Sequence, residues 1–187
     1  MIGNDIVDLN FASFNSEERR DRYALKILHP NEQEFYQVSS EKSVLIWRYW
    51  SIKEAVYKAF AQQNLAAVFS PSKIEVTIRS SKNATAHIAG NHFHCTSIMS
   101  ETLVYTVAVA RSAVYLSSYF MMKGTQHSGD HTRLKQAAAQ LLNLETNRLF
   151  IAKRNGKIPR LYDRKSQKSW PMSITHHGNF MGYALRF

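Results

Sequence analysis

Two carboxylates stand in the apolar stretch that opens the chain, MIGNDIVDLN. The isoleucine, valine and leucine residues around Asp5 and Asp8 predict a buried strand over residues 2–9. Successive side chains of a strand point to opposite faces, so Asp5 and Val7 are expected on one face and Asp8 on the other. Asp5 and Asp8 are therefore not expected to chelate the same ion unless the strand is bulged. Asp8 is interpreted as a capping or surface residue, which leaves the purpose of Asp5 open.

A glutamate and a lysine, Glu54 and Lys58, lie one turn apart within residues 41–62, the strongest helix signal in the chain. A helical wheel places them opposite the apolar stripe of that helix. The spacing by itself indicates an exposed ion pair worth about 0.3–0.5 kcal/mol. Trp47 falls in the same sector and Trp50 borders it. Because indole rings are rarely left fully solvated, we expect another lobe or a ligand to cover this side.

The remaining segments alternate between helix and strand patterns. The expected helices cover residues 16–37, with a break near Pro30, and residues 132–144. The expected strands cover residues 73–79, 84–88 and 103–110, followed after a hairpin around Asn155-Gly156 by a final strand over residues 173–187. The polar residues 121–131 are interpreted as a linker between two lobes.

The composition indicates a folded chain with an anionic partner. Its 187 residues, 44% of them hydrophobic, suffice for one domain or two small lobes. No apolar run approaches the roughly 18 residues of a membrane span, and no secretory signal is visible. The net charge of +10 favours nucleic acid, a phosphorylated small molecule or an acidic protein as the partner, unless it only solvates the surface. Nucleic-acid-binding motifs are absent from the sequence.

The single cysteine, Cys95, cannot form an intramolecular disulfide, so a reducing cytoplasm is the expected location. We interpret Cys95 as a buried hydrophobic residue. His87, His92 and His94 lie around it in the sequence. A zinc site there is disfavoured, because these residues fall on an expected edge hairpin that offers no second cysteine.

Two motifs in the first half resemble the paired signature of the 4′-phosphopantetheinyl transferases. The family has G-x-D-[IV] on a strand and W-x-x-K-E-[AS]-x-x-K on a helix, and this chain has GNDIVDL and then WSIKEAVYKAF. The intervening RDRYALKILHPNEQEFY resembles the helix of holo-acyl-carrier-protein synthases that leads to their second motif. The matching residues are Gly3, Asp5, Ile6, Trp50, Lys53, Glu54, Ala55 and Lys58.

A third signature lies near the end of the chain. NGKIPRL and MSITHHGNFMGYALRF resemble the N-G-K-P-x-L and S-[IL]-[ST]-H-[ST] pieces of the family, with Ile158 inserted in the first. In the two-lobed, surfactin-type members these pieces precede the G-x-D strand, whereas here they follow it. The chain therefore resembles a circularly rearranged two-lobed enzyme, which implies that residues 1 and 187 are spatial neighbours. His177, next to the motif histidine His176, is expected to face the other way and to be incidental.

The resemblance implies an α+β fold of two similar α/β lobes related by pseudo-two-fold symmetry. Residues 1–118 are expected to form the first lobe, with the metal-binding strand and the K-E-x-x-x-K helix. Residues 119–187 are expected to form the second, smaller lobe, with the N-G-K and S-I-T-H segments that bind coenzyme A. Two lobes in one chain imply a monomer.

The resemblance also implies the residues of the site. Asp5 and Glu54 are expected to hold Mg²⁺ together with the pyrophosphate of coenzyme A. Val7 stands where many two-lobed members have a third acidic ligand, so water is expected there. Glu54, Lys58 and His176 are the expected catalytic residues. The expected coenzyme A contacts are Lys157, Arg133, Arg48 and His176.

The implied reaction transfers 4′-phosphopantetheine from coenzyme A to a serine of an acyl or peptidyl carrier protein and releases adenosine 3′,5′-bisphosphate. Glu54 or a metal-bound water is the expected base. An acidic carrier protein is expected to dock on the basic helix 19–26, which carries Arg19, Arg20, Arg22 and Lys26. Neither nucleic acid nor a membrane is an expected partner. The alternative is a module that binds coenzyme A or a carrier protein without turnover, and the non-acidic Val7 favours it. The sequence leaves open whether the pathway is fatty-acid, polyketide or peptide synthesis.

Overall fold

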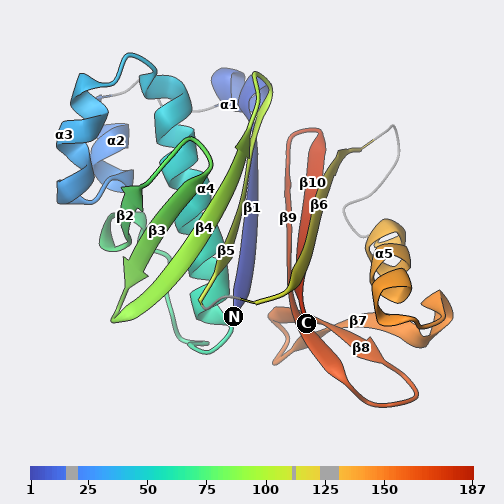
Figure 1. Ribbon diagram of the computed structural model, residues 1–187. Helices are drawn as coiled ribbons and strands as arrows, with labels where there is room; N and C mark the ends of the chain where they lie inside the picture. Colours follow the sequence, from blue (N-terminus) through green and yellow to red (C-terminus); the bar gives the residue numbers. More distant parts are fainter. Residues whose placement is uncertain (16–20, 111–112, 123–130) are drawn as a thin grey trace.

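Two five-stranded antiparallel sheets stand side by side in the computed structural model, with helices packed against their outer faces (Figure 1). The structure describes residues 1–15, 21–110, 113–122 and 131–187. None of the helices in these ranges is long and apolar enough to cross a membrane.

The first sheet has the strand order β1-β5-β4-β3-β2. Its strands are β1 (Ile2–Asp8), β2 (Glu75–Ile78), β3 (Asn83–Ile88), β4 (Asn91–Met99) and β5 (Leu103–Val109). Its helices are α1 (Leu9–Asn15), α2 (Asp21–Ile27), α3 (Pro30–Val38), α4 (Lys42–Ala61) and the 3₁₀ turn η1 (Pro71–Lys73). The longest of them, α4, packs on β1 and β5.

The second sheet has the order β6-β10-β9-β8-β7, which repeats the connectivity of the first strand for strand. Its strands are β6 (Tyr115–Met121), β7 (Leu149–Arg154), β8 (Ile158–Asp163), β9 (Ser169–His177) and β10 (Phe180–Arg186). Its helices are α5 (Thr132–Leu142) and the 3₁₀ turn η2 (Thr146–Arg148). In each sheet a helical segment separates the first strand from the second. The expected α+β class with two similar lobes is confirmed.

Strand β1 is central to the molecule although it lies at the edge of its own sheet. All seven of its residues are buried. Ile2 and Ile6 pack with Phe180 of β10 in the core between the sheets, whereas Val7 joins the core under α4. Because side chains alternate along a strand, Asp5 faces α4 together with Val7, as predicted.

The free edge of β1 is closed by side chains instead of by another strand. Gln62, directly after α4, accepts a hydrogen bond from Ile2 N–H at 3.1 Å and donates to the Ile2 carbonyl at 2.7 Å. It also donates to the Met172 carbonyl of β9 at 3.0 Å. Farther along, Ser173 Oγ accepts from Asn4 N–H at 3.1 Å. These contacts protect an edge that is otherwise open to pairing with other chains, and they hold the lobes together.

Most predicted elements of the first half are confirmed, with ends shifted by a few residues. The helix over 41–62 and the strands over 2–9, 84–88 and 103–110 correspond to α4, β1, β3 and β5. The helical segment 16–37 divides into α2 and α3, and its residues 16–20 lie outside the described part of the chain. Met1 and Arg186 line one cavity, so the chain ends are neighbours, as the motif order implied (Figure 1).

Two predictions about the second half are wrong. Residues 173–187 do not form one strand, because Gly178 takes a φ of +53° and turns the chain into the hairpin β9–β10. Residues 121–131 do not link the lobes, because they join β6 to α5 within the second lobe, with 123–130 outside the described residues. The chain changes sheets between β5 and β6, so the boundary expected after residue 118 falls inside β6.

Gly3 determines how closely β1 approaches α4. A Cβ atom at this position would clash with the carbonyl oxygen of Ala55 and would lie 2.6 Å from the backbone nitrogen of Ala59. Both are helix backbone atoms, which cannot move aside without disturbing the helix. The glycine of the G-x-D motif thus allows the strand that carries Asp5 to lie against the helix that carries Glu54.

Replacing Gly3 by alanine is expected to lower the free energy of unfolding by about 3 kcal/mol, because β1 and α4 must separate. Urea denaturation measures this loss. Gly156→Ala is the control, since a Cβ there meets no atom and only the left-handed backbone strain of about 1–2 kcal/mol is expected. A smaller loss for Gly3→Ala than for the control would contradict the close approach.

Candidate active site

A cavity of about 520 Å³, which we call the central cavity, lies between the two lobes. Strand β1 contributes Asp5 to its walls, and α4 contributes Glu54 and Lys58. Strand β9 of the second lobe contributes Thr175 and His176. Three elements that are far apart in the sequence therefore bring ionisable and hydroxyl groups to one place.

The ammonium group of Lys58 lies between the two carboxylates. Lys58 Nζ is 3.1 Å from Asp5 Oδ1 and 3.6 Å from Glu54 Oε1. These two oxygens are therefore no further apart than 6.7 Å, to which the two distances add. Ligand oxygens of one octahedral Mg²⁺ lie about 3–4 Å apart, so the two carboxylates lie within a few ångströms of the spacing that one ion requires.

The hydroxyl group of Thr175 completes the surroundings of Asp5. Thr175 Oγ1 donates to Asp5 Oδ1 at 3.1 Å and accepts from Lys58 Nζ at 3.3 Å. The other carboxylate oxygen, Asp5 Oδ2, is buried and has no hydrogen-bond partner among the described residues. A buried carboxylate oxygen without a donor is costly, and a bound cation would satisfy it.

The charges of the central cavity favour a cation. Burial raises the pKa of Glu54, the ammonium group of Lys58 lowers it, and the carboxylate of Asp5 raises it. Two carboxylates share one lysine, so the three groups together carry a net negative charge when all are ionised. In a chain whose total charge is +10, this is a local reversal of sign that attracts a further positive charge.

Aromatic rings line the central cavity beside α4. Trp50 meets Phe69 edge-on, with ring centroids 5.5 Å apart, and Tyr57 lies 5.1 Å from Phe69. Trp47 is buried and packs against Tyr23 of α2. These neighbours of Trp47 and Trp50 belong to the first lobe, whereas we expected another lobe or a ligand to cover both rings.

A second cavity of about 310 Å³, the side cavity, adjoins the central cavity, and Lys58 and Ile174 line both. Lys157 is exposed on the wall of the side cavity. It follows the hairpin turn between β7 and β8, where Asn155 and Gly156 take φ values of 51° and 69°. The hairpin predicted around these two residues is confirmed.

The two histidines of β9 point in different directions. His176 is exposed on the wall of the central cavity, whereas His177 Nδ1 accepts a hydrogen bond from Asp8 N–H of β1 at 2.9 Å. Burial lowers the pKa of His177, although the carboxylates of Asp5 and Asp8 oppose this shift, and an acceptor nitrogen must be unprotonated. The expectation that His177 is incidental is wrong, because it joins the two lobes.

Asp8 is a capping residue, as expected. Asp8 Oδ1 accepts from Phe11 N–H in the first turn of α1, and Oδ2 accepts from Asn179 N–H, both at 3.0 Å. Its side chain is buried, so the surface alternative is wrong. A Cβ at Gly178 would clash with Asp8 Oδ2, so the β9–β10 turn needs glycine for space as well as for its backbone angle.

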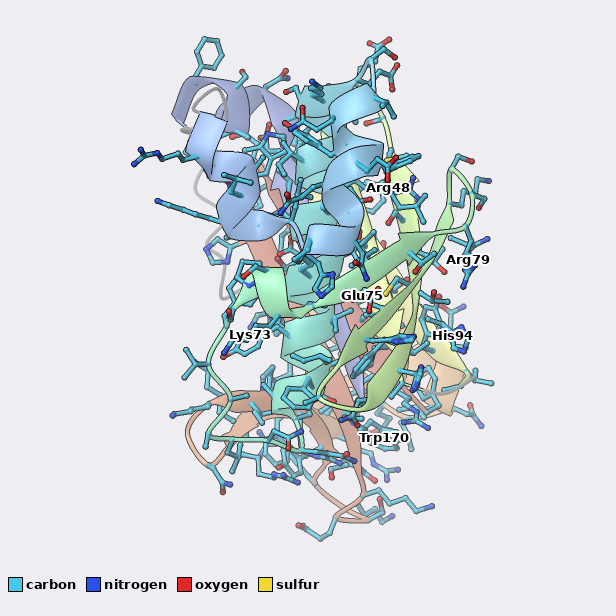
Figure 2. The ribbon with its side chains drawn as sticks, turned by 90° about the vertical axis from the view of Figure 1, so that its left-hand side faces the viewer. Arg48, Lys73, Glu75, Arg79, His94 and Trp170 are labelled. Atoms are coloured by element: carbon cyan, nitrogen blue, oxygen red, sulfur yellow. The ribbon has the colours of Figure 1, made fainter. Side chains whose placement is uncertain are left out.

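Two of the expected coenzyme A contacts line neither cavity. Arg48 is buried, and its Nη2 donates to the Ser80 carbonyl between β2 and β3 at 2.6 Å. Figure 2 shows Arg48 on the side of α3 and the first sheet. Arg48 precedes Glu54 by six residues, so the two side chains lie about 240° apart around α4. The guanidinium of Arg133 lies 4.5 Å from the ring centroid of Phe120 on β6, within the second lobe.

The two lysines of the helix motif have different surroundings. Lys53 is fully buried, with Nζ 2.7 Å from Glu32 Oε2 and 2.7 Å from the Ile74 carbonyl oxygen. Burial raises the pKa of Glu32 and lowers that of Lys53, while their mutual attraction opposes both shifts. Glu32 also accepts from Val76 N–H at 2.6 Å. Lys53 therefore joins α4 to α3 and β2, and Lys58 is the lysine that faces the cavity.

Cys95 is a buried core residue, as expected, and burial raises its pKa to about 12. His87 Nε2 and His92 Nδ1 lie 3.0 Å apart on the exposed face of β3 and β4. Among the described residues, no three histidine, cysteine, aspartate or glutamate side chains are placed to hold one metal ion. Strand β4 is not an edge strand, because it lies between β3 and β5.

Comparison with known proteins identifies the family. The family model described as the 4′-phosphopantetheinyl transferase superfamily matches residues 1–110, more than half of the chain. The chain belongs to this superfamily. The superfamily match covers Asp5, Glu54 and Lys58 of the central cavity, whereas Thr175 and His176 lie beyond it.

Two holo-[acyl-carrier-protein] synthases are similar to this superfamily member. The synthase of Mycoplasmopsis pulmonis (strain UAB CTIP) is 35% identical over 77 residues, which are 41% of this chain and 63% of the relative. The match thus spans less than two thirds of that relative. The crystal structure of the Thermotoga maritima synthase aligns with a TM-score of 0.46 and 14% identity, over 82% of this chain and 76% of that chain.

Lys53→Met is expected to lower the free energy of unfolding by about 3–5 kcal/mol, because the Glu32 carboxylate is left buried without its cation. Lys58→Met should cost less, because Lys58 is partly exposed to solvent and Asp5 keeps the hydroxyl of Thr175 as a donor. Urea denaturation of both variants makes the comparison. Equal losses would contradict the separate roles of the two lysines.

Proposed function

We propose that this protein transfers the 4′-phosphopantetheine group from coenzyme A to a serine hydroxyl of an acyl or peptidyl carrier protein and releases adenosine 3′,5′-bisphosphate. The observation that carries the proposal is that Asp5, Glu54 and Lys58 surround one cavity between the lobes, in a chain of the 4′-phosphopantetheinyl transferase superfamily. The similarity to a holo-[acyl-carrier-protein] synthase supports a carrier protein as the acceptor.

Asp5 and Glu54 are the proposed ligands of a divalent cation, with Mg²⁺ as the first choice. Both supply the carboxylate oxygens that Mg²⁺ prefers, and Asp5 Oδ2 is a buried oxygen in need of a partner. When bound, the ion would neutralise the charge that accumulates on the pyrophosphate oxygens. Val7 offers no carboxylate, so water and phosphate oxygens would complete the ligand set.

Glu54, Lys58 and His176 are the proposed catalytic residues. Lys58 has a flexible side chain with a compact positive charge, which suits contact with a phosphate group. His176 offers a ring nitrogen from the second lobe on the same cavity wall. Glu54 is the proposed base for the serine proton, through the carboxylate oxygen that does not bind the ion.

The side cavity is proposed to receive the 3′-phosphoadenosine end of coenzyme A. It adjoins the central cavity through Lys58 and Ile174, so one elongated ligand can occupy both. Apolar residues such as Leu65 and Pro159 on its walls suit an adenine ring. Lys157 is the proposed phosphate contact, because its ammonium group is exposed on the same wall.

The acceptor is proposed to be an acidic carrier protein that is attracted by the net charge of +10. Arg22 and Lys26 lie on α2 and remain part of the proposed docking surface. Arg19 and Arg20 of the same surface lie outside the described residues. A carrier protein accounts for the charge without nucleic acid. One chain supplies both walls of the central cavity, so the monomer is the proposed active form.

The direct test incubates the protein with an apo acyl carrier protein, coenzyme A and Mg²⁺ and follows the mass of the carrier protein. We expect the carrier to gain one phosphopantetheine group. Glu54→Gln is expected to lower the rate at least about 100-fold, because it removes both a metal ligand and the base. Glu34→Gln is the matched control, since it removes the same charge from an exposed site on α3 and should leave the rate unchanged.

Two outcomes would contradict the proposal. If several acyl and peptidyl carrier proteins gain no mass while calorimetry shows that coenzyme A binds, the protein is a binding module without turnover. If transfer occurs and Glu54→Gln is as fast as Glu34→Gln, Glu54 does not belong to the catalytic machinery.

A further inference from the structure

Strand β9 presents every second side chain to the free edge of β1. Ser173 Oγ accepts from Asn4 N–H at 3.1 Å, and His177 Nδ1 accepts from Asp8 N–H at 2.9 Å. Thr175 lies midway between these two contacts, and its partner is different. Thr175 bonds to no backbone group of β1 in the described structure but to the side chain of Asp5.

The two oxygens of the Asp5 carboxylate have different surroundings. Asp5 Oδ1 receives hydrogen bonds from Thr175 Oγ1 and from Lys58 Nζ, both at 3.1 Å. Asp5 Oδ2 is buried and receives no hydrogen bond from the described residues. The carboxylate is therefore held by one oxygen, and the other is left for a ligand.

Of the two donors, Thr175 is the one with a fixed position. Its backbone is part of the β9–β10 ladder, where it pairs with Gly182, and its side chain is buried. Lys58 reaches Asp5 through a long flexible side chain and also lies 3.6 Å from Glu54. A bound phosphate or cation that attracts or repels Lys58 would leave the hydroxyl of Thr175 as the remaining constraint on Asp5.

We propose that Thr175 is a positioning residue of the second lobe, which orients the Asp5 carboxylate of the first lobe so that Oδ2 is free to bind the divalent cation. The inference rests on the proposed function, since it adds a residue of the second lobe to the cation site proposed above. Hydrogen bonds to metal-bound carboxylates fix their orientation, and their loss typically weakens metal affinity about 10–100-fold.

The test titrates Mn²⁺, a paramagnetic stand-in for Mg²⁺, into the full chain with saturating coenzyme A and measures free Mn²⁺ by electron paramagnetic resonance. Thr175→Val keeps the shape of the side chain and removes the hydroxyl, so we expect the dissociation constant for Mn²⁺ to rise about 10-fold. Thr175→Ser restores the hydroxyl and is expected to bind nearly as the wild type does. The Michaelis constant for Mg²⁺ should rise in Thr175→Val by a similar factor.

Ser173→Ala is the matched control, because it removes an interlobe hydrogen bond from the same face of β9 without touching Asp5. If Ser173→Ala weakens Mn²⁺ binding as much as Thr175→Val does, the effect comes from lobe docking and the role of Thr175 is overturned. Equal affinity of wild type and Thr175→Val also overturns it and leaves the proposed function standing. Failure of the wild type to bind Mn²⁺ in the presence of coenzyme A would instead contradict the proposed cation site itself.

Discussion

The packing of β1 between α4 and β9 is the constraint on which the rest of this structure depends. On one side, Gly3 lets the strand lie directly on the backbone of α4. On the other side, side chains of β9 bond to the free edge of the strand. Because both neighbours are fixed in this way, the Asp5 side chain meets Lys58 from the helix and Thr175 from the second lobe. The site is thus a product of three elements, and neither lobe alone contains it.

The distribution of charge gives the molecule two different electrostatic surfaces. The chain as a whole is strongly basic, which favours anionic partners at long range. At the central cavity the sign reverses, since Asp5 and Glu54 share the single ammonium group of Lys58. This arrangement suits a substrate that is itself a polyanion and that brings a cation with it. The other motif lysine, Lys53, is paired with Glu32 inside the first lobe.

The sequence predicted the parts of the site that follow from local periodicity. Three predicted features each depend on a single element, and the observed geometry agrees with each of them. They are the shared face of Asp5 and Val7 on β1, the one-turn spacing of Glu54 and Lys58 on α4, and the hairpin at Asn155-Gly156. The roles of Thr175 and His177 depend on which face of β9 meets β1, and no local pattern states that. Arg48 is a different case, because its six-residue spacing from Glu54 already turns it away from the cavity, and the local pattern therefore argued against the expected contact.

The central claim is that Asp5 and Glu54 bind one cation at the interface of the two lobes. Anomalous diffraction from crystals grown with coenzyme A and Mn²⁺ tests it most directly, because the Mn²⁺ ion is located without reference to activity. We predict one strong peak within ligand distance of carboxylate oxygens of both residues and next to the pyrophosphate. A peak bound to only one of the two carboxylates, or coenzyme A seated away from this cavity, would contradict the claim.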